Sequence, residues 1–289
     1  MRQPPDVSEQ SLSSYDFDRT TVYACQADQR FSYCLYVPAA LRSLEARQRA
    51  EVLVAVHGTG RGNQAMRDLF APLADDLGLI VLAPLFPCGI GSAGERDAYK
   101  YIEGSGVRYD LLLLEMLNEV GARYGAPTDR VMLMGFSGGA HFAHRFLYLH
   151  PERLAAVSVC APGSITRPDP DRNWWVGVKD MRERFGRELD LAAMRRVDVH
   201  LAVGGKDVET HEITHAPGGT YWMEGANDAG RTRVDRLRSL EKSLEAVGVP
   251  TQVDILEGVA HEGAPLAAAA SNFFRNLRAP RAAAREGSR

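Results

Sequence analysis

Short, nearly continuous apolar runs alternate with amphipathic stretches along most of this chain. Such a run is typical of a strand buried on both faces, whereas apolar residues that recur every three or four positions predict a helix. The predicted buried strands are 51–56, 79–83, 131–134, 154–160, 197–203 and 251–256. The predicted helices are 64–77, 107–123, about 138–150, 228–247 and a closing helix to about residue 277. A hairpin, 20–25 with 31–37, precedes them. This order predicts an α/β fold: a mostly parallel, twisted sheet of about eight strands with helices on both faces.

The same pattern predicts one large domain with two terminal segments. We expect residues 1–18 to form a flexible leader, 19–278 the domain, and 279–289, rich in Ala and Arg, a frayed tail. Residues 162–196 interrupt the strand–helix rhythm with prolines and an adjacent tryptophan pair, so we expect them to form a small lid. The glycine-rich stretch 84–106 is too long for a simple connector and predicts a functional loop near a site.

Composition and net charge give no sign of a nucleic-acid or membrane-surface partner. The 289 residues are 45% hydrophobic and 25% charged, with a formal net charge of −3, so nothing points to nucleic acid or an anionic membrane surface as a partner. The polar N-terminus argues against a signal peptide, and no stretch has membrane-spanning length, so a cytoplasmic location is expected. Cys25 and Cys34 could pair across the hairpin in an oxidising compartment; without an export signal we expect free, mostly buried thiols.

The strongest chemical signal is the segment Gly135-Phe136-Ser137-Gly138-Gly139. An apolar strand precedes it and an amphipathic helix follows, which is the context that makes Gly-x-Ser-x-Gly a nucleophile turn. The turn holds the serine hydroxyl at the carboxyl end of the sheet, where the N-terminus of the helix favours a developing negative charge. We therefore predict that Ser137 is a nucleophile; the alternative is a turn serine that caps a helix.

A serine hydroxyl needs a base, and the base needs an acid that orients it. Asp207 follows a predicted strand and a Gly-Gly turn, and His261 follows the last strand in a glycine-bracketed loop. The chain order Ser, Asp, His is the one found in α/β-hydrolases. Glu209 and Asp254 are rival candidates for the acid.

An oxyanion hole needs two N–H donors. We expect one from the backbone of Gly138 and the other from Thr59, with Gly60 as runner-up, in the loop after strand 51–56. His57 in that loop is expected to be structural. His141 and His144, on the helix behind Ser137, are expected to pack or to lie on the helix surface.

A second motif suggests a different chemistry. His211-Glu212-Ile213-Thr214-His215 matches the zinc-binding pattern His-Glu-x-x-His, which requires both histidines on one stable helix. Pro217 and two glycines follow at once, and no third ligand is evident, so we expect no metal and no other cofactor. A zinc metallopeptidase using His211 and His215 remains the alternative from a different enzyme class.

On these residues the chain resembles the α/β-hydrolase superfamily over nearly its whole length. More narrowly, segments 135–139, 145–146, 150–153 and 161–163 resemble the esterase group that includes poly(3-hydroxybutyrate) depolymerases and feruloyl esterases. The resemblance implies cofactor-free acyl transfer to water through an acyl-serine, with Ser137, Asp207 and His261 as the triad. Because a signal peptide and a polymer-binding domain are not evident, it favours a small ester substrate over a solid polymer.

The substrate is less well defined. The aromatic residues expected near the pocket, which would suit an apolar or aromatic acyl group or else pack within a lid, are Phe136, Trp174, Trp175, Tyr221 and Trp222. Arg108 could meet a substrate carboxylate, or pair with Asp110 or Glu103. An amidase, a lactonase or a carbon–carbon bond hydrolase would use the same triad, and a ligand-binding protein could use the same fold. No pattern indicates an oligomeric state.

Overall fold

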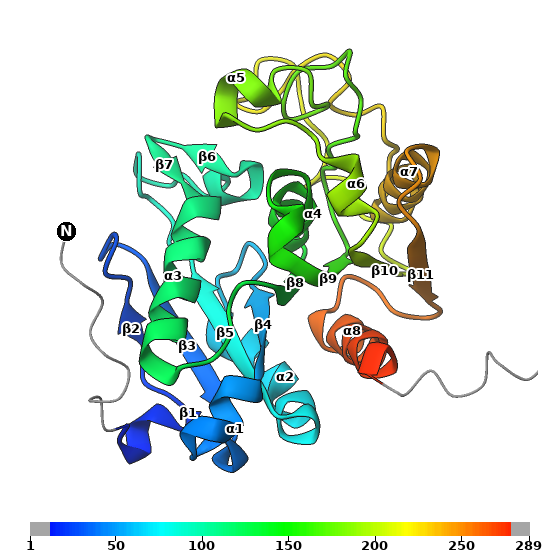
Figure 1. The fold of residues 1–289 in the computed structure, drawn as a ribbon. Coiled ribbons are helices and arrows are strands. Elements are labelled where there is room, and N and C mark those ends of the chain that lie inside the picture. Colours follow the sequence, from blue (N-terminus) through cyan, green and yellow to red (C-terminus); the bar gives the residue numbers. More distant parts are fainter. Residues whose placement is uncertain (1–11, 279–289) are drawn as a thin grey trace, which may run out of the picture.

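The computed structural model describes residues 12–278, and within them nine strands form one sheet (Figure 1). The strand order is β1-β3-β5-β4-β8-β9-β10-β11, with β2 paired to β3. The strands are β1 (Asp18–Arg19), β2 (Tyr23–Ala24), β3 (Ser32–Val37), β4 (Glu51–Val56), β5 (Leu79–Leu85), β8 (Val131–Phe136), β9 (Leu154–Cys160), β10 (Asp198–Gly204) and β11 (Thr251–Leu256). Strand β3 runs antiparallel to β1, β2 and β5, and the sheet is parallel from β5 to β11.

Helices cover both faces of this sheet. Helices α2 (Asn63–Leu77) and α8 (Gly263–Arg278) pack together on one face, and α3 (Tyr109–Tyr124), α4 (Gly138–Leu149) and α7 (Arg233–Ala246) lie on the other (Figure 1). The short helices are α1 (Leu44–Arg49), α5 (Met181–Phe185) and α6 (Leu191–Met194). A two-stranded ribbon, β6 (Glu103–Gly104) with β7 (Val107–Arg108), precedes α3. The central strands are buried on both faces, which explains their continuous apolar sequences.

The predicted fold class and the N-terminal hairpin are confirmed. Two predicted helices begin later than expected. The helix predicted from residue 228 begins at Arg233, because the side chain of Thr232 accepts a hydrogen bond from Asp235 N, and the Asp235 carboxylate accepts one from Thr232 N. The helix predicted from residue 107 begins at Tyr109, because Val107 and Arg108 form β7. Within residues 12–278, no helix is long and apolar enough to cross a membrane.

The expected leader and tail lie partly outside the description, since residues 1–11 and 279–289 are not described. Residues 12–18, expected to be loosely held, are instead anchored: Asp16 is buried and accepts hydrogen bonds from Arg123 and Tyr23. Cys25 and Cys34 are both buried free thiols.

Within the segment 162–196, expected to form a lid, residues 162–185 lie beside residues 205–232 above the carboxyl ends of the strands (Figure 1). Helix α6 instead contacts residues 151–153, which precede β9, so the end of the segment returns to the amino ends of the strands. The two tryptophans of the segment tie it to neighbouring loops. Trp174 Nε1 donates a hydrogen bond to Tyr101 O at 3.1 Å, and Trp175 Nε1 donates one to Tyr221 O at 2.9 Å. Both indole rings are almost fully buried, so they act as structural anchors of this segment.

Asp16→Asn is expected to lower the free energy of unfolding by about 2 kcal/mol at pH 7. Burial raises the pKa of the Asp16 carboxyl, but hydrogen bonds from Arg123, Ser13 and Tyr23 outweigh it and lower the pKa from 3.8 to about 2. Each pKa unit corresponds to about 1.4 kcal/mol. Because the pKa is lower in the folded state, this contribution is complete above about pH 5 and fades as the pH falls towards about 2.

Urea unfolding of both proteins at pH 7 and pH 3 measures this effect. The difference between them should shrink by about half at pH 3. An equal difference at both pH values would show that the charge of Asp16 is not responsible.

Candidate active site

Ser137 occupies a strained turn between β8 and α4. Its backbone has φ 54° and ψ −112°, a region that side-chain-bearing residues rarely adopt. The turn requires glycines on both sides. A Cβ on Gly135 would lie 2.0 Å from Gly139 O, and a Cβ on Gly139 would lie 2.3 Å from Val56 O. These contacts are closer than any side chain permits, so the glycines allow α4 to approach the ends of β4 and β8.

The structure brings the three predicted triad residues together. His261 Nε2 lies 3.0 Å from Ser137 Oγ, and His261 Nδ1 lies 2.6 Å from Asp207 Oδ2. They follow β8, β10 and β11, whose carboxyl ends meet at one edge of the sheet. With Nδ1–H donating to the carboxylate, Nε2 carries the lone pair that accepts the serine proton. The Phe136 ring stacks on the imidazole at 4.9 Å and helps to hold its plane.

Asp207 is buried and makes a second strong contact that the sequence did not predict. Arg233, at the start of α7, is also buried and places its Nη1 3.0 Å from Asp207 Oδ1. Burial alone raises the pKa of Asp207, but the hydrogen bond from His261 and the charge of Arg233 outweigh it and keep the pKa below 3.8. Asp207 is therefore ionised at neutral pH and oriented from both sides.

The two rival acids lie elsewhere. Glu209 is exposed beside His211, and Asp254 accepts a hydrogen bond from His200 Nε2 at 3.1 Å. Only Asp207 contacts His261. Sequence offered no signal for Arg233, because an arginine in the first turn of an amphipathic helix is usually a solvent-facing residue.

A small pocket of about 190 Å³ lies beside Ser137, and Ser137, Gly138 and Thr59 all line it. Gly60, the runner-up donor, does not line this pocket. Gly138 is also held closely, since a Cβ there would lie 2.2 Å from the Tyr99 hydroxyl. Gly138 and Thr59 therefore both lie at the pocket beside Ser137.

The three histidines expected to be structural each make backbone hydrogen bonds. His57 donates to Gly58 O and accepts from Phe86 N, and burial lowers its pKa to about 4. His144 likewise bridges Ala140 O and Thr166 N. His141 Nε2 accepts hydrogen bonds from two backbone amides, those of residues 163 and 164.

The two histidines of the zinc-like motif contact different residues. Residues 210–214 make a single helical turn. His211 is exposed beside Glu209, whereas His215 Nε2 lies 2.7 Å from Ser164 Oγ. Across residues 12–278, no three His, Cys, Asp or Glu side chains gather closely enough to hold a metal ion.

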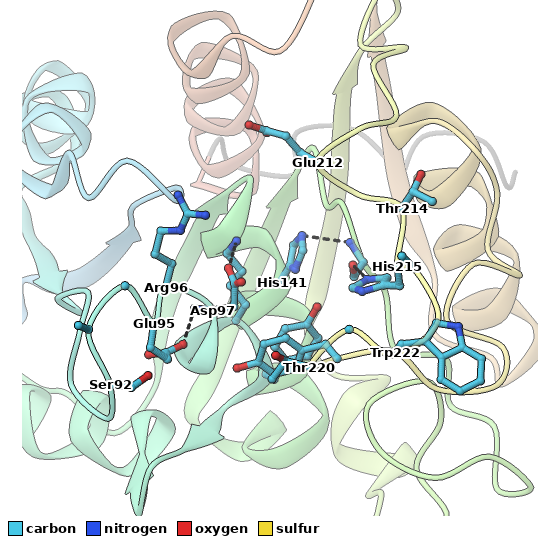
Figure 2. Close-up of a pocket in the computed structure, with 18 residues that line it drawn as sticks. Ser92, Glu95, Arg96, Asp97, His141, Glu212, Thr214, His215, Thr220 and Trp222 are labelled. Carbon is cyan, nitrogen blue, oxygen red and sulfur yellow. Dashed lines mark hydrogen bonds and ion pairs between the residues drawn. The ribbon is translucent and has the colours of Figure 1, made fainter.

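A larger cleft of about 540 Å³ (Figure 2) adjoins the small pocket and shares lining residues with it. Of the expected pocket aromatics, Tyr221 and Trp222 line this cleft and also an adjoining depression of about 240 Å³, whereas Trp174 and Trp175 line only the depression. Arg108 makes a two-pronged ion pair with Asp110 and lines neither the cleft nor the small pocket.

Solved structures of similar shape are hydrolases. Poly(aspartic acid) hydrolase-1 from Sphingomonas sp. KT-1 is 19% identical with a TM-score of 0.70, and 88% of this chain matches 97% of that one. The poly(3-hydroxybutyrate) depolymerase LpqC from Bordetella parapertussis is 22% identical with a TM-score of 0.67, and the coverage is 87% and 86%. A ferulic acid esterase is 18% identical with a TM-score of 0.58, covering 90% and 98%. No family model and no curated protein matches the sequence. These likenesses establish the class of architecture: the chain has the α/β-hydrolase fold.

Gly139→Ala is expected to lower the free energy of unfolding by about 3 kcal/mol or more, because the added methyl collides with the carbonyl oxygens of β4 and its loop. Gly60→Ala is the matched control, since nothing lies within 4 Å of a Cβ there, and its stability should change by less than about 0.5 kcal/mol. Chemical denaturation measures both. Equal effects would show that close packing does not govern residue 139.

Proposed function

We propose that this protein is a serine hydrolase that cleaves carboxylic esters through an acyl-serine intermediate. The observation that carries the proposal is the continuous relay from Ser137 through His261 to Asp207, with the serine held on a strained turn. A serine in such a relay is activated because its proton has an acceptor within hydrogen-bond distance. The hydrolases of the same fold support the proposal at the level of bond cleavage by water.

The proposed reaction proceeds in two halves. Ser137 Oγ attacks the ester carbonyl carbon while His261 Nε2 takes its proton, and Asp207 stabilises the resulting imidazolium. The carbonyl oxygen becomes an oxyanion beside the backbone N–H groups of Gly138 and Thr59. Collapse of this intermediate releases the alcohol, which receives the proton from His261. Water, deprotonated by His261, then attacks the acyl-serine, releases the acid and restores the serine.

The same relay would serve an amidase, a lactonase or a carbon–carbon bond hydrolase, and a panel of such substrates separates these from an esterase. Cleavage of an ester, whether open-chain or a lactone, is favoured over cleavage of an amide or a carbon–carbon bond because an alcohol leaves more readily than an amine or a carbon group. No step requires a metal or an organic cofactor, and we propose a small ester as the partner.

A fluorophosphonate should phosphonylate Ser137, with loss of fluoride, and add one adduct to the intact mass. Ser137→Ala should carry no adduct. Ser164→Ala is the matched control, because Ser164 lines the adjoining cleft and is also hydrogen-bonded to a histidine, His215, and this variant should still carry one adduct. An adduct on Ser137→Ala would refute Ser137 as the nucleophile.

Ser137→Ala and His261→Ala should each lower kcat for 4-nitrophenyl acetate by about 10⁴–10⁶-fold, and the double variant by little more, because the two residues act as a unit. Asp207→Asn should lose less while remaining folded. Asp254→Asn, a carboxylate bonded to a different histidine, should keep its activity. Full activity in Asp207→Asn would exclude Asp207 as the acid.

A further inference from the structure

The large cleft leads directly to the nucleophile. Its walls are residues 92–101 and 212–222, and His141 lies between them (Figure 2). It shares five lining residues with the small pocket beside Ser137: Arg96, Asp97, Lys100, His141 and Glu212. A substrate whose ester lies at Ser137 therefore extends its acyl or alcohol part past the charged members of this set, Arg96, Asp97, Lys100 and Glu212.

Two of the three acidic groups on the walls are paired with cations, and the third, Glu95, keeps its negative charge because its hydrogen-bond partners are neutral. Asp97 pairs with Lys100 at 2.6 Å, and Glu95 accepts hydrogen bonds from two backbone amides, those of residues 97 and 98. Glu212 is 67% exposed and lies 3.4 Å from Arg233. Arg96, by contrast, lines both cavities and pairs with no carboxylate within residues 12–278. The wall thus offers one unpaired guanidinium close to Ser137.

Directly behind the lining lies a fully buried cation, Arg145, which no carboxylate in the described chain neutralises. Its guanidinium donates to Thr166 Oγ1 at 2.8 Å and to Lys100 O at 2.5 Å, and it lies 4.7 Å from the centre of the Tyr101 ring. Burial lowers the pKa of Arg145 only to about 10, so it stays charged at neutral pH. Its positive field acts on the cleft through a single layer of residues.

Arg236 is a second buried cation beneath the cleft. It donates to Gly163 O, Gly230 O and the Asn227 side chain, all of them neutral acceptors. The pKa of His215 is lowered to about 4, mainly by burial and further by the charges of Arg236 and Arg145. This wall residue is therefore neutral at pH 7. Two buried guanidinium groups with neutral partners therefore leave the cleft floor positive.

One donor on the floor is also unused. His141 is buried, and its Nε2 accepts two backbone hydrogen bonds, which places its proton on Nδ1. That Nδ1 has no partner within residues 12–278. Burial and the charge of Arg145 hold the pKa of His141 far below 6.5, so it is a neutral donor. An unpaired buried N–H is costly.

We propose that this cleft binds a carboxylate of the substrate, so that the hydrolase acts on esters whose acyl or alcohol part carries a negative charge. The inference rests on the proposed function, because it assigns a substrate class to the same site. Arg96 and the Lys100 ammonium contact the carboxylate, and the field of Arg145 and Arg236 stabilises it. This charged, polar ester is a different substrate class from the apolar or aromatic acyl group that the sequence left open.

Three esters of matched size test the charge: monoethyl succinate, ethyl succinamate and ethyl 4-aminobutanoate, which are anionic, neutral and cationic. Each is measured as a competitor of 4-nitrophenyl acetate, so that binding is obtained whether or not the ethyl ester is cleaved. At low ionic strength the anion should inhibit about 10-fold more strongly than the amide, and the cation least. The ratio of inhibition by the anion to inhibition by the amide should be smaller at high salt, because salt screens the charges.

Arg96→Gln should reduce the preference for the anion by about fivefold or more. Arg49→Gln is the matched control, an exposed arginine on α1 paired with Glu45, and should keep the preference. Equal inhibition by all three esters, inhibition by none, or strongest inhibition by the cation would overturn the carboxylate site. Failure to cleave 4-nitrophenyl acetate at all would instead refute the proposed function.

Discussion

The backbone strain at Ser137 is the constraint on which the rest of this structure depends. Holding a serine at positive φ costs about 1–3 kcal/mol and persists only where the surroundings determine it. Here β4 and β8 are in register, with Val56 opposite Gly135, and Gly139 packs against the Val56 carbonyl. The buried parallel strands therefore stabilise the turn. The turn places the Ser137 hydroxyl beyond the end of β8, at the N-terminus of α4.

Around that turn, three buried arginines hold the residues and loops that form the site. Arg233 neutralises and orients Asp207, while Arg145 and Arg236 bind carbonyl and hydroxyl oxygens of the segment that follows β9. Buried cations are costly unless they are hydrogen-bonded, and these arginines meet that need mainly with neutral acceptors. Their residual positive charge then lies beneath the cleft. The groups that order the loops are thus the same groups that set the electrostatic character of the site.

Much of the architecture could be predicted because local patterns carry it. Apolar runs marked the buried strands, Gly78 and Gly125 end α2 and α3 in left-handed conformations, and the glycines around Ser137 marked the turn. Helix starts were less accurate: Thr232 determines the start of α7 through a reciprocal cap that hydrophobic periodicity does not register. Trp174 and Trp175 were expected near the pocket, but their partners on distant loops make them anchors.

The sequence by itself determined the strand–helix order, the nucleophile turn and the chain order of Ser137, Asp207 and His261, because periodicity and short motifs are local properties. Only the tertiary structure decided that Asp207, and neither Glu209 nor Asp254, meets His261, and that Arg233 pairs with it. It alone placed Arg145 and Arg236 beneath the cleft. These choices depend on which loops meet at the carboxyl edge of the sheet, and contacts between residues far apart in the chain leave no local pattern.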